Sequence, residues 1–443
     1  MTKIAPLSGF PEWLPAGRLV EQQVVDTLRE TFELHAFSGI ETRAVEPVER
    51  LLSKGETSKE IYLLSRLQDR EKSGPAELGL HFDLTVPLAR YVLEYAGHLH
   101  FPFRRYQIQK VWRGERPQDG RFREFLQADV DVVGQGELAF HHEIEVPLVM
   151  VDALARLPIP RVIIRASNRK VAQGFYEAIG IENTEETLRV IDKLDKIGAG
   201  AVAEILQEQL GATPDQARLA LQLAEISGSD ASVADRVMAL GYNSPLLEEG
   251  LEELVALIEG ANALIPGSLQ ADLKIARGLD YYTGSVYEST MLGHEDLGSV
   301  CSGGRYDSLA SDGKQTYPGV GLSIGVSRML ARIIGKETVV PSRPVPTTVL
   351  IAVNDESERL HAEQTAMRLR QRGIAAEVSP NCAKFGKQIR YADRRGIPYV
   401  WFSTEEGEQV KDIRSGEQVP TDSNTWLPPA EDRKVTLVRP DKD

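Results

Sequence analysis

Arginines, acids and tyrosines gather in three glycine-rich stretches of the second half of the sequence. The stretches are residues 276–284, 302–307 and 319–328, and their charged or phenolic members include Arg277, Asp280, Tyr281, Tyr282, Arg305 and Arg328. Glycine costs a helix about 1 kcal/mol relative to alanine, so it favours turns or a close approach of the backbone to a ligand here. A turn that only leads into a strand at 285–288 is the simpler interpretation of the first stretch. The other two stretches favour a functional site.

A hairpin between residues 106 and 133 is predicted to present a second set of chemical side chains. Alternating apolar and polar residues indicate strands at 106–113 and 125–133, with one face toward a core. The other face and the connecting loop carry Gln107, Gln109, Arg113, Glu115, Arg116, Gln118, Arg121, Arg123, Phe125, Gln127, Asp129 and Asp131. A polar strand face is usually only solvated. Because arginine forks match phosphate oxygens, however, this face is predicted to bind a polyphosphate.

Two polar residues precede a predicted helix. Asp83 and Thr85 point to one face if they belong to a strand. Alternatively, one of these side chains caps the helix predicted at 88–94, which Pro87 would open. The pattern leaves both interpretations open.

Arg328 falls in the first turn of a helix that helical spacing predicts from about residue 326. A positive charge is unfavourable at a helix N-terminus. A bound anion would offset that cost, so the position of Arg328 indicates a ligand site.

Further elements must hold these side chains in place. Helical spacing predicts a first helix at 19–34 and a helical run from about 168 to 264, and residues 60–69 are interpreted as a strand. Turns are expected to break the helical run at Gly211, Gly228 and Gly241. The helical run carries no recognisable chemistry, which indicates an insertion between two halves of a catalytic sheet.

A proline-rich linker at 341–346 separates the last part of the sequence. Strands and helices alternate beyond it, which predicts a small α/β domain with a mixed sheet. Its second helix carries basic residues that include Lys387 and Arg390. A solvated face and an RNA contact explain them equally well.

Composition excludes some classes of protein. The net charge of −14 argues against a general nucleic-acid coat, although local basic patches remain compatible with it. Two cysteines cannot form a disulfide framework or a cysteine zinc site, which fits a reducing cytoplasm. Residues 1–15 contain no apolar run of signal-peptide length, and no stretch approaches the apolar length of a membrane span.

Together the stretches resemble class II aminoacyl-tRNA synthetases over nearly the whole chain. The segments that carry the resemblance are residues 111–116 with 121–127 (motif 2), residues 319–328 (motif 3), the helix and strand through Thr42 (motif 1), and residues 276–284 with 302–307, which resemble the two signatures of histidyl-tRNA synthetases. The sequence departs from the class at Arg43, where proline is usual, and has Asp83 and Asp131 where some members have glutamate.

The resemblance implies an α+β fold, with a class II antiparallel-sheet catalytic domain, a helical insertion and a C-terminal α/β anticodon-binding domain. The implied domains are residues 1–170 (catalytic core, first part), 171–263 (helical insertion), 264–340 (catalytic core, second part) and 345–443 (anticodon-binding domain). It also implies a cytoplasmic homodimer that does not bind membranes.

The implied reaction has two steps. The carboxylate of L-histidine attacks the α-phosphate of ATP, which gives histidyl-adenylate and pyrophosphate, and the histidyl group then passes to the 3′ end of tRNA(His). Mg²⁺ would act through the ATP phosphates, with no metal site of the protein's own. The protein would mainly position the reactants and stabilise charge on phosphorus.

Residue roles follow from the resemblance alone. Arg113 and Arg277 are implied to be catalytic at the α-phosphate, with Arg277 in place of a metal. The implied ATP-binding residues are Arg113, Glu115, Arg121, Phe125 and Arg328; those for histidine are Asp83, Thr85, Gln127, Asp131, Tyr281, Tyr282 and Arg305; those for tRNA are Arg116, Gln118, Lys387 and Arg390.

Two other classes of function are weighed against this one. A non-catalytic regulatory relative would bind histidine or a partner enzyme, but it usually lacks the arginine signature and the C-terminal domain. An RNA-binding scaffold would need no histidine pocket, and the negative net charge disfavours broad RNA affinity.

Overall fold

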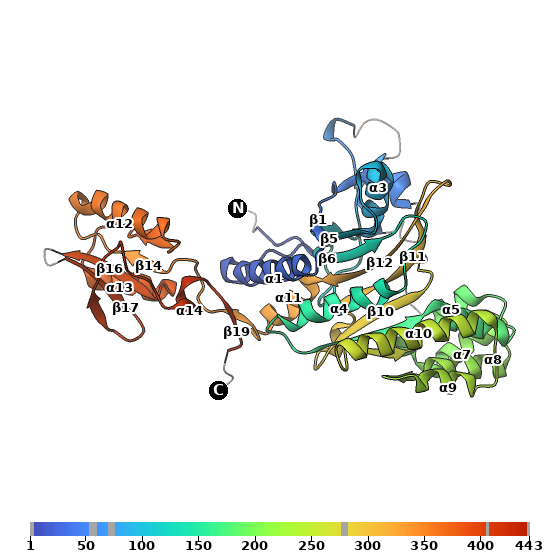
Figure 1. Ribbon diagram of the computed structural model, residues 1–443. Coiled ribbons are helices and arrows are strands. Elements are labelled where there is room, and N and C mark those ends of the chain that lie inside the picture. Colours follow the sequence, from blue (N-terminus) through green and yellow to red (C-terminus); the bar gives the residue numbers. More distant parts are fainter. Residues whose placement is uncertain (1–3, 53–59, 70–75, 276–281, 405–406, 441–443) are drawn as a thin grey trace. The chain divides into compact units, whose positions relative to one another are not determined.

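The computed structural model describes residues 4–52, 60–69, 76–275, 282–404 and 407–440. The chain divides into two units. The first contains residues 1–11 and 26–332, and the second contains residues 12–25 and 333–443. Each unit is described by itself below, with the element labels of Figure 1.

The first unit is organised around a largely antiparallel sheet (Figure 1). Within the described residues its strands are, in spatial order, β1 (Ser38–Gly39), β5 (Phe103–Trp112), β6 (Glu124–Val133), β12 (Thr316–Gly325), β11 (Cys301–Ser311), β10 (Ser285–Met291), β7 (Val162–Asn168), β9 (Leu269–Asp272) and β8 (Ser227–Gly228). Only the β1–β5 and β7–β9 pairs among these run parallel. The α+β fold class is thereby confirmed.

Helices cover the apolar face of the central strands. The helix α1 (Pro15–Leu34) places Phe32 against Tyr106 of β5, with their ring centroids 5.7 Å apart. The Tyr106 hydroxyl donates to Glu33 at 2.7 Å. The helix α4 (His141–Ala155) packs against β6, β7 and β12, and Val130 and Val132 of β6 are fully buried. The apolar face of the predicted hairpin is therefore a core face.

Residues 45–80 contain the strands of a smaller, three-stranded sheet. It pairs β2 (Val45–Pro47), β4 (Leu78–Leu80) and β3 (Leu63–Leu64). The strand expected at 60–69 is therefore wrong except for two residues, because only Leu63 and Leu64 find a partner strand. The helix α2 (Val48–Leu51) directly follows β2, and the helix α3 (Thr85–Tyr95) follows β4.

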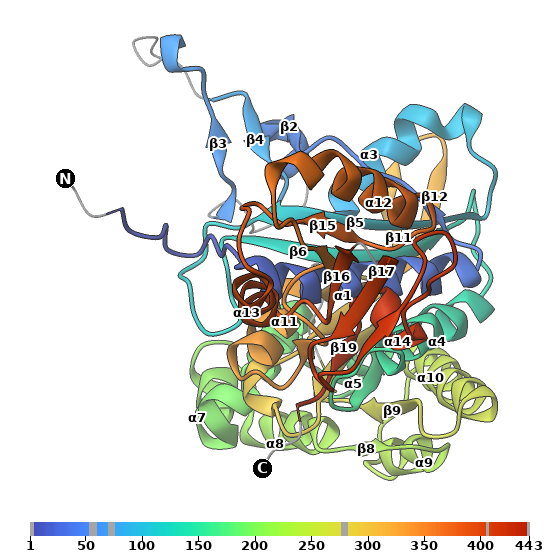
Figure 2. The ribbon, with the colours of Figure 1, turned by 90° about the vertical axis from the view of Figure 1, so that its left-hand side faces the viewer.

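Residues 169–264 form a helical segment, coloured green to yellow in Figures 1 and 2. Its helices are α5 (Arg169–Ala178), α6 (Thr184–Ile191), α7 (Leu194–Glu208), α8 (Pro214–Ala224), α9 (Ser232–Met238) and α10 (Pro245–Leu264). Thr213 and Gln216 form a capping box at the start of α8, and Ser244 caps α10 ahead of Pro245. The short β8 lies between α8 and α9 and contains Gly228, where the sequence predicts a break in the helical run.

The second unit contains a five-stranded sheet with a helix on each face. Its strands are, in spatial order, β15 (Ala376–Val378), β14 (Val349–Ile351), β16 (Tyr399–Thr404), β17 (Gly407–Asp412) and β18 (Gln418–Pro420). The helix α12 (Arg359–Gln371) buries Ala366 and Leu369 against Ile351 and Trp401. The helix α13 (Phe385–Arg395) packs on the opposite face, against Val400 and Phe402 (Figures 1 and 2).

The remaining elements complete the chain. They are α11 (Val326–Gly335), which follows β12, the two-residue strands β13 (Val340–Pro341) and β19 (Leu437–Val438), which pair with each other, and α14 (Ala430–Arg433). No helix of the described residues is long and apolar enough to cross a membrane.

Candidate active site

A cleft opens where the β5–β6 hairpin meets β11, β12 and the start of α11. The residues that line it are Arg113, Glu115, Gly120, Arg121, Phe122, Phe125, Gln127, Ser299, Val300, Ser302, Ser323, Gly325 and Arg328. Three arginines therefore face one cavity: Arg113, which directly follows β5, Arg121 of the hairpin loop and Arg328 of α11. Such a set of fixed cations is suited to a polyanion.

The Arg113 side chain is held in place by contacts with neighbouring residues. Its Nε donates to the carbonyl oxygen of Phe82 at 2.9 Å, and its guanidinium carbon lies 5.2 Å from the centre of the Phe125 ring. Glu115 Oε1 lies 3.9 Å from Nη1 of Arg113. These contacts hold the guanidinium at the cleft while most of its fork stays available for a ligand.

Arg328 links three segments of the cleft. Its Nη1 donates to the carbonyl oxygen of Ser299 at 2.6 Å, and its Nε donates to that of Gly120 at 3.3 Å. Gly120 has a φ of +68°, which favours glycine at the end of the hairpin loop. Arg328 carries a positive charge at the N-terminus of α11, where such a charge is unfavourable. Backbone carbonyl oxygens accept its hydrogen bonds, and the side chain lines the cleft.

The hairpin loop is closed by a short bridge between Gln118 and Arg121. Arg121 Nη1 lies 3.6 Å from Glu115 Oε2 inside the cleft. Arg116 and Gln118 are exposed on the loop. The loop therefore presents one arginine to the cleft and another to solvent.

Behind the cleft, one face of the sheet forms a polar floor that is closed to solvent. Strand register places Arg105 opposite Asp131 and Gln107 opposite Asp129 across β5 and β6. Arg105 Nη2 lies 2.7 Å from Asp131 Oδ2 and 3.9 Å from Asp129. Burial raises the pKa of Asp129 to about 7, although Arg105 opposes the shift.

Glycines in β12 make room for this floor. Tyr306 of β11 donates from its hydroxyl to Asp131 Oδ1 at 2.8 Å. A Cβ at Gly319 would lie 2.3 Å from the Tyr306 ring, and one at Gly321 would lie 1.9 Å from Asp131 Oδ1. Gly319 and Gly321 therefore leave space on β12 for the side chains of Tyr306 from β11 and Asp131 from β6.

Asp83 and Thr85 lie at the start of α3. Asp83 Oδ1 accepts from the backbone N–H of Val86 at 3.1 Å, so the capping interpretation holds for Asp83. Both residues belong to α3 or its approach rather than to a strand, and Thr85 is the first residue of α3. Asp83 is also close enough to Asp129 to raise the pKa of that carboxyl.

Tyr282 lies beside the floor, whereas Arg305 lies on the opposite, α4-covered face of β11. Arg305 Nη1 donates to the buried Glu143 at 2.8 Å, and its Nε donates to Asp307 at 3.0 Å. The Tyr282 ring lies over Gly304, where a Cβ would come within 2.9 Å of it. Arg305 thus ties β11 to α4, while Tyr282 lies on the same side of the sheet as Tyr306.

The structure brings most of the predicted residues of the first unit together. Arg277 and Tyr281 lie outside the described residues. Lys387 and Arg390 lie in the second unit, exposed on α13. Sequence reasoning missed Arg105 and Tyr306 as members of the polar floor; the alternation of the hairpin strand would have found Arg105 if it had been extended by one residue.

Among the described residues, no group of three or more His, Cys, Asp or Glu side chains could hold a metal ion. Glu115 is the acid that lines the cleft itself. This donor set suits a cation that reaches the cleft mostly ligated by phosphate and water, as Mg²⁺ usually is with nucleotides.

Comparison with known proteins adds an independent finding. Residues 9–329 match the family model of histidyl-tRNA synthetase, and residues 347–422 match that of an anticodon binding domain. The histidine–tRNA ligase of Micrococcus luteus is 57% identical over 99% of both chains. The crystal structure of histidyl-tRNA synthetase from Nostoc, 34% identical, superposes with a TM-score of 0.83 over 95% of this chain and 97% of that one.

A third relative shares the fold alone. It is a Bacillus halodurans protein described as an ATP phosphoribosyltransferase regulatory subunit/histidyl-tRNA synthetase, 19% identical, with a TM-score of 0.74 over 91% of this chain and 98% of that one. The family match covers far more than half of the chain, and the close relatives align over almost their full length. The chain therefore belongs to the histidyl-tRNA synthetase family.

Proposed function

We propose that this chain is a histidine–tRNA ligase whose first step takes place in the arginine-lined cleft. A carboxylate oxygen of L-histidine attacks the α-phosphorus of ATP, the bond to the bridging oxygen breaks, and pyrophosphate leaves. A terminal hydroxyl of tRNA(His) then attacks the carbonyl carbon of the adenylate, and AMP leaves. The observation that carries the proposal is the continuity of a cationic cleft with a buried acidic floor on one sheet face.

The nucleotide is assigned to the cationic end. Arg113 binds the α-phosphate, because its guanidinium is held at the cleft by Phe82 while it retains donors for oxygen. Arg277 is assigned to the same phosphate from the sequence signature. Phe125 stacks on adenine, and Arg121, Glu115 and Arg328 contact the outer phosphates or the base. These donors stabilise charge that develops on phosphorus.

Histidine is assigned to the polar floor. Asp83, Thr85 and Gln127 hold its α-amino group, and Asp131 and Tyr282 read its imidazole ring, with Tyr281 and Arg305 beside the pocket. Asp131 is 2% exposed, and Gln127 Oε1 has no hydrogen-bond partner among the described residues. Buried acceptors of this kind favour a ligand with N–H groups and reject isosteres without them, because a mismatched ligand leaves polar groups unpaired.

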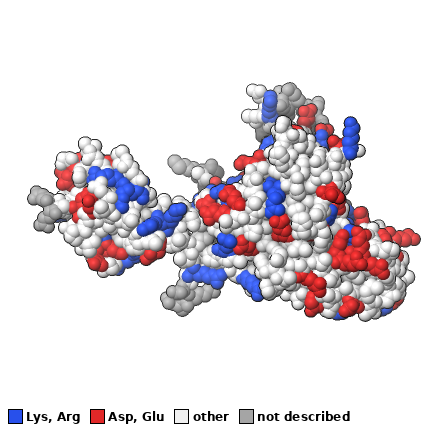
Figure 3. Space-filling view, in the orientation of Figure 1, with Lys and Arg blue, Asp and Glu red and all other residues white. Residues whose placement is uncertain are grey.

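Transfer RNA is assigned to exposed basic residues. Arg116 and Gln118 on the hairpin loop would meet the acceptor end, and Lys387 and Arg390 on α13 would meet the anticodon arm. Exposed acids of α10, among them Glu248, Glu249 and Glu252, contribute to the acidic surface that Figure 3 shows over the helical segment. That surface would repel phosphate, so the loop and α13 are the better candidates.

The remaining assignments complete the proposal. Mg²⁺ would enter on the ATP phosphates and neutralise the charge of the pyrophosphate group; the protein's own residues bind, orient and exclude water. We further propose a cytoplasmic homodimer, with residues 1–170 and 264–340 as the catalytic core, 171–263 as a helical insertion and 345–443 as the anticodon-binding domain.

The test is charging of purified tRNA(His) with labelled histidine and ATP. Acid-stable, base-labile label on tRNA(His), absent with other tRNAs, supports the proposal. Histidine binding without charging, by protein that is folded, would instead identify a regulatory role and contradict it.

A further inference from the structure

Arg105 is a fully buried arginine in the middle of the polar floor, and the reaction described above gives it no contact with ATP. Its side chain has 0% exposure. Its Nη2 lies 2.7 Å from Asp131 Oδ2, and its Nη1 donates to Gln107 Oε1 at 3.3 Å. The same Nη2 donates to the carbonyl oxygen of Leu84 at 3.4 Å. The guanidinium therefore lies beneath the residues assigned to histidine.

The charges around Arg105 do not balance. Asp131 and Asp129 are 2% and 1% exposed, and they share this one guanidinium. A buried carboxylate without a partner is costly, and two that lie close together repel each other. Removing Arg105 would therefore leave two buried acids with no cation beside them, which favours uptake of a proton.

Asp131 is held from two sides. Arg105 contacts its Oδ2, and the Tyr306 hydroxyl donates to its Oδ1. Each carboxylate oxygen has two lone pairs, so one acceptor direction is left on each oxygen for a substrate N–H. The orientation of those remaining directions depends on Arg105 and Tyr306 together.

We propose that Arg105 is a positioning residue for the selection of histidine: it fixes the orientation and the negative charge of Asp131, the acid that reads the imidazole ring. The inference rests on the proposed function and adds to it a residue that does not itself touch the substrate. A second network fixes the neighbouring glutamines, since Gln107 Nε2 donates to Thr42 Oγ1 at 2.9 Å. Gln107, which accepts a hydrogen bond from Arg105, is thus itself held by Thr42.

The charge state of Asp131 depends on every group that faces it or its neighbour Asp129. These groups are Arg105 on β5, Asp129 on β6, Tyr306 on β11 with Tyr282 beside it, Asp83 before α3, and Cys301 and Ser323 near Asp129. Arg105 is the cation among these groups. Its loss should therefore make histidine binding depend more strongly on pH than it does in the unaltered protein.

The experiment measures histidine-dependent ATP–pyrophosphate exchange in Arg105→Met, Arg105→Lys and the double variant Arg105→Met with Asp129→Asn. For Arg105→Met we expect the KM for histidine to rise about tenfold or more, with a much smaller change in the KM for ATP. The ratio of histidine KM values, variant to unaltered protein, should fall as pH rises from about 6 to 8.5, because Asp131 regains its charge. Taking the ratio cancels the titration of histidine itself.

Two variants separate positioning from general structural damage. Lysine in Arg105→Lys keeps the positive charge but lacks the planar guanidinium. This variant should therefore keep the pH profile of the unaltered protein while it binds histidine less well. In the double variant the second acid is neutral, so the repulsion between the two acids is gone and the pH dependence should be weaker than in Arg105→Met. Arg104→Met is the matched control. Arg104 directly precedes Arg105 on β5, so its side chain points to the other face of the sheet, where it pairs with Glu145 at 2.8 Å. It should leave both KM values unchanged.

The inference is overturned if Arg105→Met leaves the KM for histidine unchanged, or if the rise is equal for both substrates and at every pH. Should Arg105→Met fail to fold, Arg105→Lys and the double variant still decide the matter by their pH profiles. No exchange by the unaltered protein would contradict the proposed function itself. If the unaltered protein catalyses exchange but the Arg105 variants show no change in the KM for histidine or in its pH dependence, only this inference is contradicted.

Discussion

A Cβ at position 321 would lie 1.9 Å from Oδ1 of Asp131. Gly321 and Asp131 face each other across the β6–β12 pair, so the glycine leaves the space that the carboxylate occupies. No rotamer of a larger residue at 321 avoids this overlap, because the clash involves the Cβ atom itself.

Gly321→Ala should therefore displace Asp131 and weaken histidine binding. We expect the KM for histidine to rise about tenfold or more, since a misplaced acceptor loses a hydrogen bond to a charged group, while the KM for ATP changes little. Steady-state exchange kinetics measure both constants. Gly200→Ala, where an added Cβ meets nothing within 4 Å, is the control. Equal KM values for Gly321→Ala and the unaltered protein would remove Asp131 from the pocket.

Arg113→Lys should slow the chemical step. Lysine keeps the charge but loses the planar fork, and it cannot reproduce both the bond to Phe82 and a bidentate contact with phosphate. We expect the rate of adenylate formation in a single turnover to fall by about 100-fold. Arg156→Lys, which alters a surface pair with Asp152, serves as control. A single-turnover rate within a factor of about two of the unaltered rate would show that Arg113 does not act on the phosphate.

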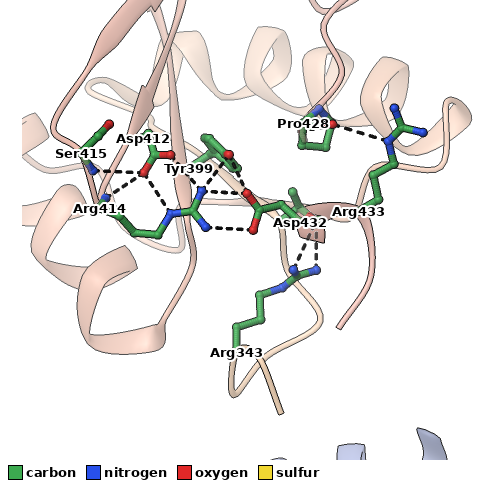
Figure 4. A network of polar contacts seen from close by, with 9 residues as sticks. Arg343, Tyr399, Asp412, Arg414, Ser415, Pro428, Asp432 and Arg433 are labelled. Carbon is green, nitrogen blue, oxygen red and sulfur yellow. Dashed lines mark hydrogen bonds and ion pairs between the residues drawn. The ribbon is translucent and has the colours of Figure 1, made fainter. Parts of the chain in front are cut away.

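The second unit depends on a buried arginine. Arg343 is 6% exposed, and it donates to the carbonyl oxygens of Val345, Pro346 and Asp432 and to Thr348 Oγ1. Figure 4 shows it beneath the Asp432 carboxylate, which is bound by Arg414 and Tyr399 on its other side. One side chain thus fixes the linker and the segment that precedes β19.

Arg343→Met should destabilise this unit by about 3 kcal/mol, because several buried acceptors lose their donor at once. Chemical denaturation followed by the fluorescence of Trp401 and Trp426 measures the change. Arg433→Met is the comparison: Arg433 is exposed and makes one long bond, to Pro428 at 3.5 Å. The two variants should differ by more than about 2 kcal/mol, and equal stability would contradict the role of Arg343.

Asp129 should make the stability of the first unit depend on pH. Burial raises the pKa of Asp129 from 3.8 to about 7. The native state therefore holds the proton more tightly than the unfolded state, so this carboxyl lowers the stability as pH rises from about 4 to 7. Asp129→Asn removes the effect. The free energy of unfolding of the variant, minus that of the unaltered protein, should increase by about 4 kcal/mol between pH 4 and pH 8. A constant difference would show that Asp129 is ionised throughout.

The hairpin shows how much of the site could be predicted. Alternation alone separated its two faces, and the structure confirms strands at Phe103–Trp112 and Glu124–Val133. Arg105 was missed because the first strand was expected to begin at residue 106. Alternation extended to residue 105 would place Arg105 on the polar face, but its burial has no signal in a single sequence, since most arginines lie at the surface.

Other parts of the site depend on contacts between distant residues. Tyr306 and Asp131 are 175 residues apart in the sequence, and only the β6–β12–β11 order brings them together. Arg305 and Glu143 are 162 apart and meet because α4 packs behind the same sheet. The strand predicted at 60–69 is wrong outside Leu63 and Leu64 for a related reason, because a segment forms a strand only where a partner strand is available.

Histidine-dependent ATP–pyrophosphate exchange tests the central claim most directly. The assay contains Mg²⁺ and no tRNA, and each of the other amino acids serves as a control. The account predicts exchange with histidine alone, because the acidic floor selects the ring and the arginines carry the phosphate chemistry. No exchange by folded protein that still binds histidine would contradict it.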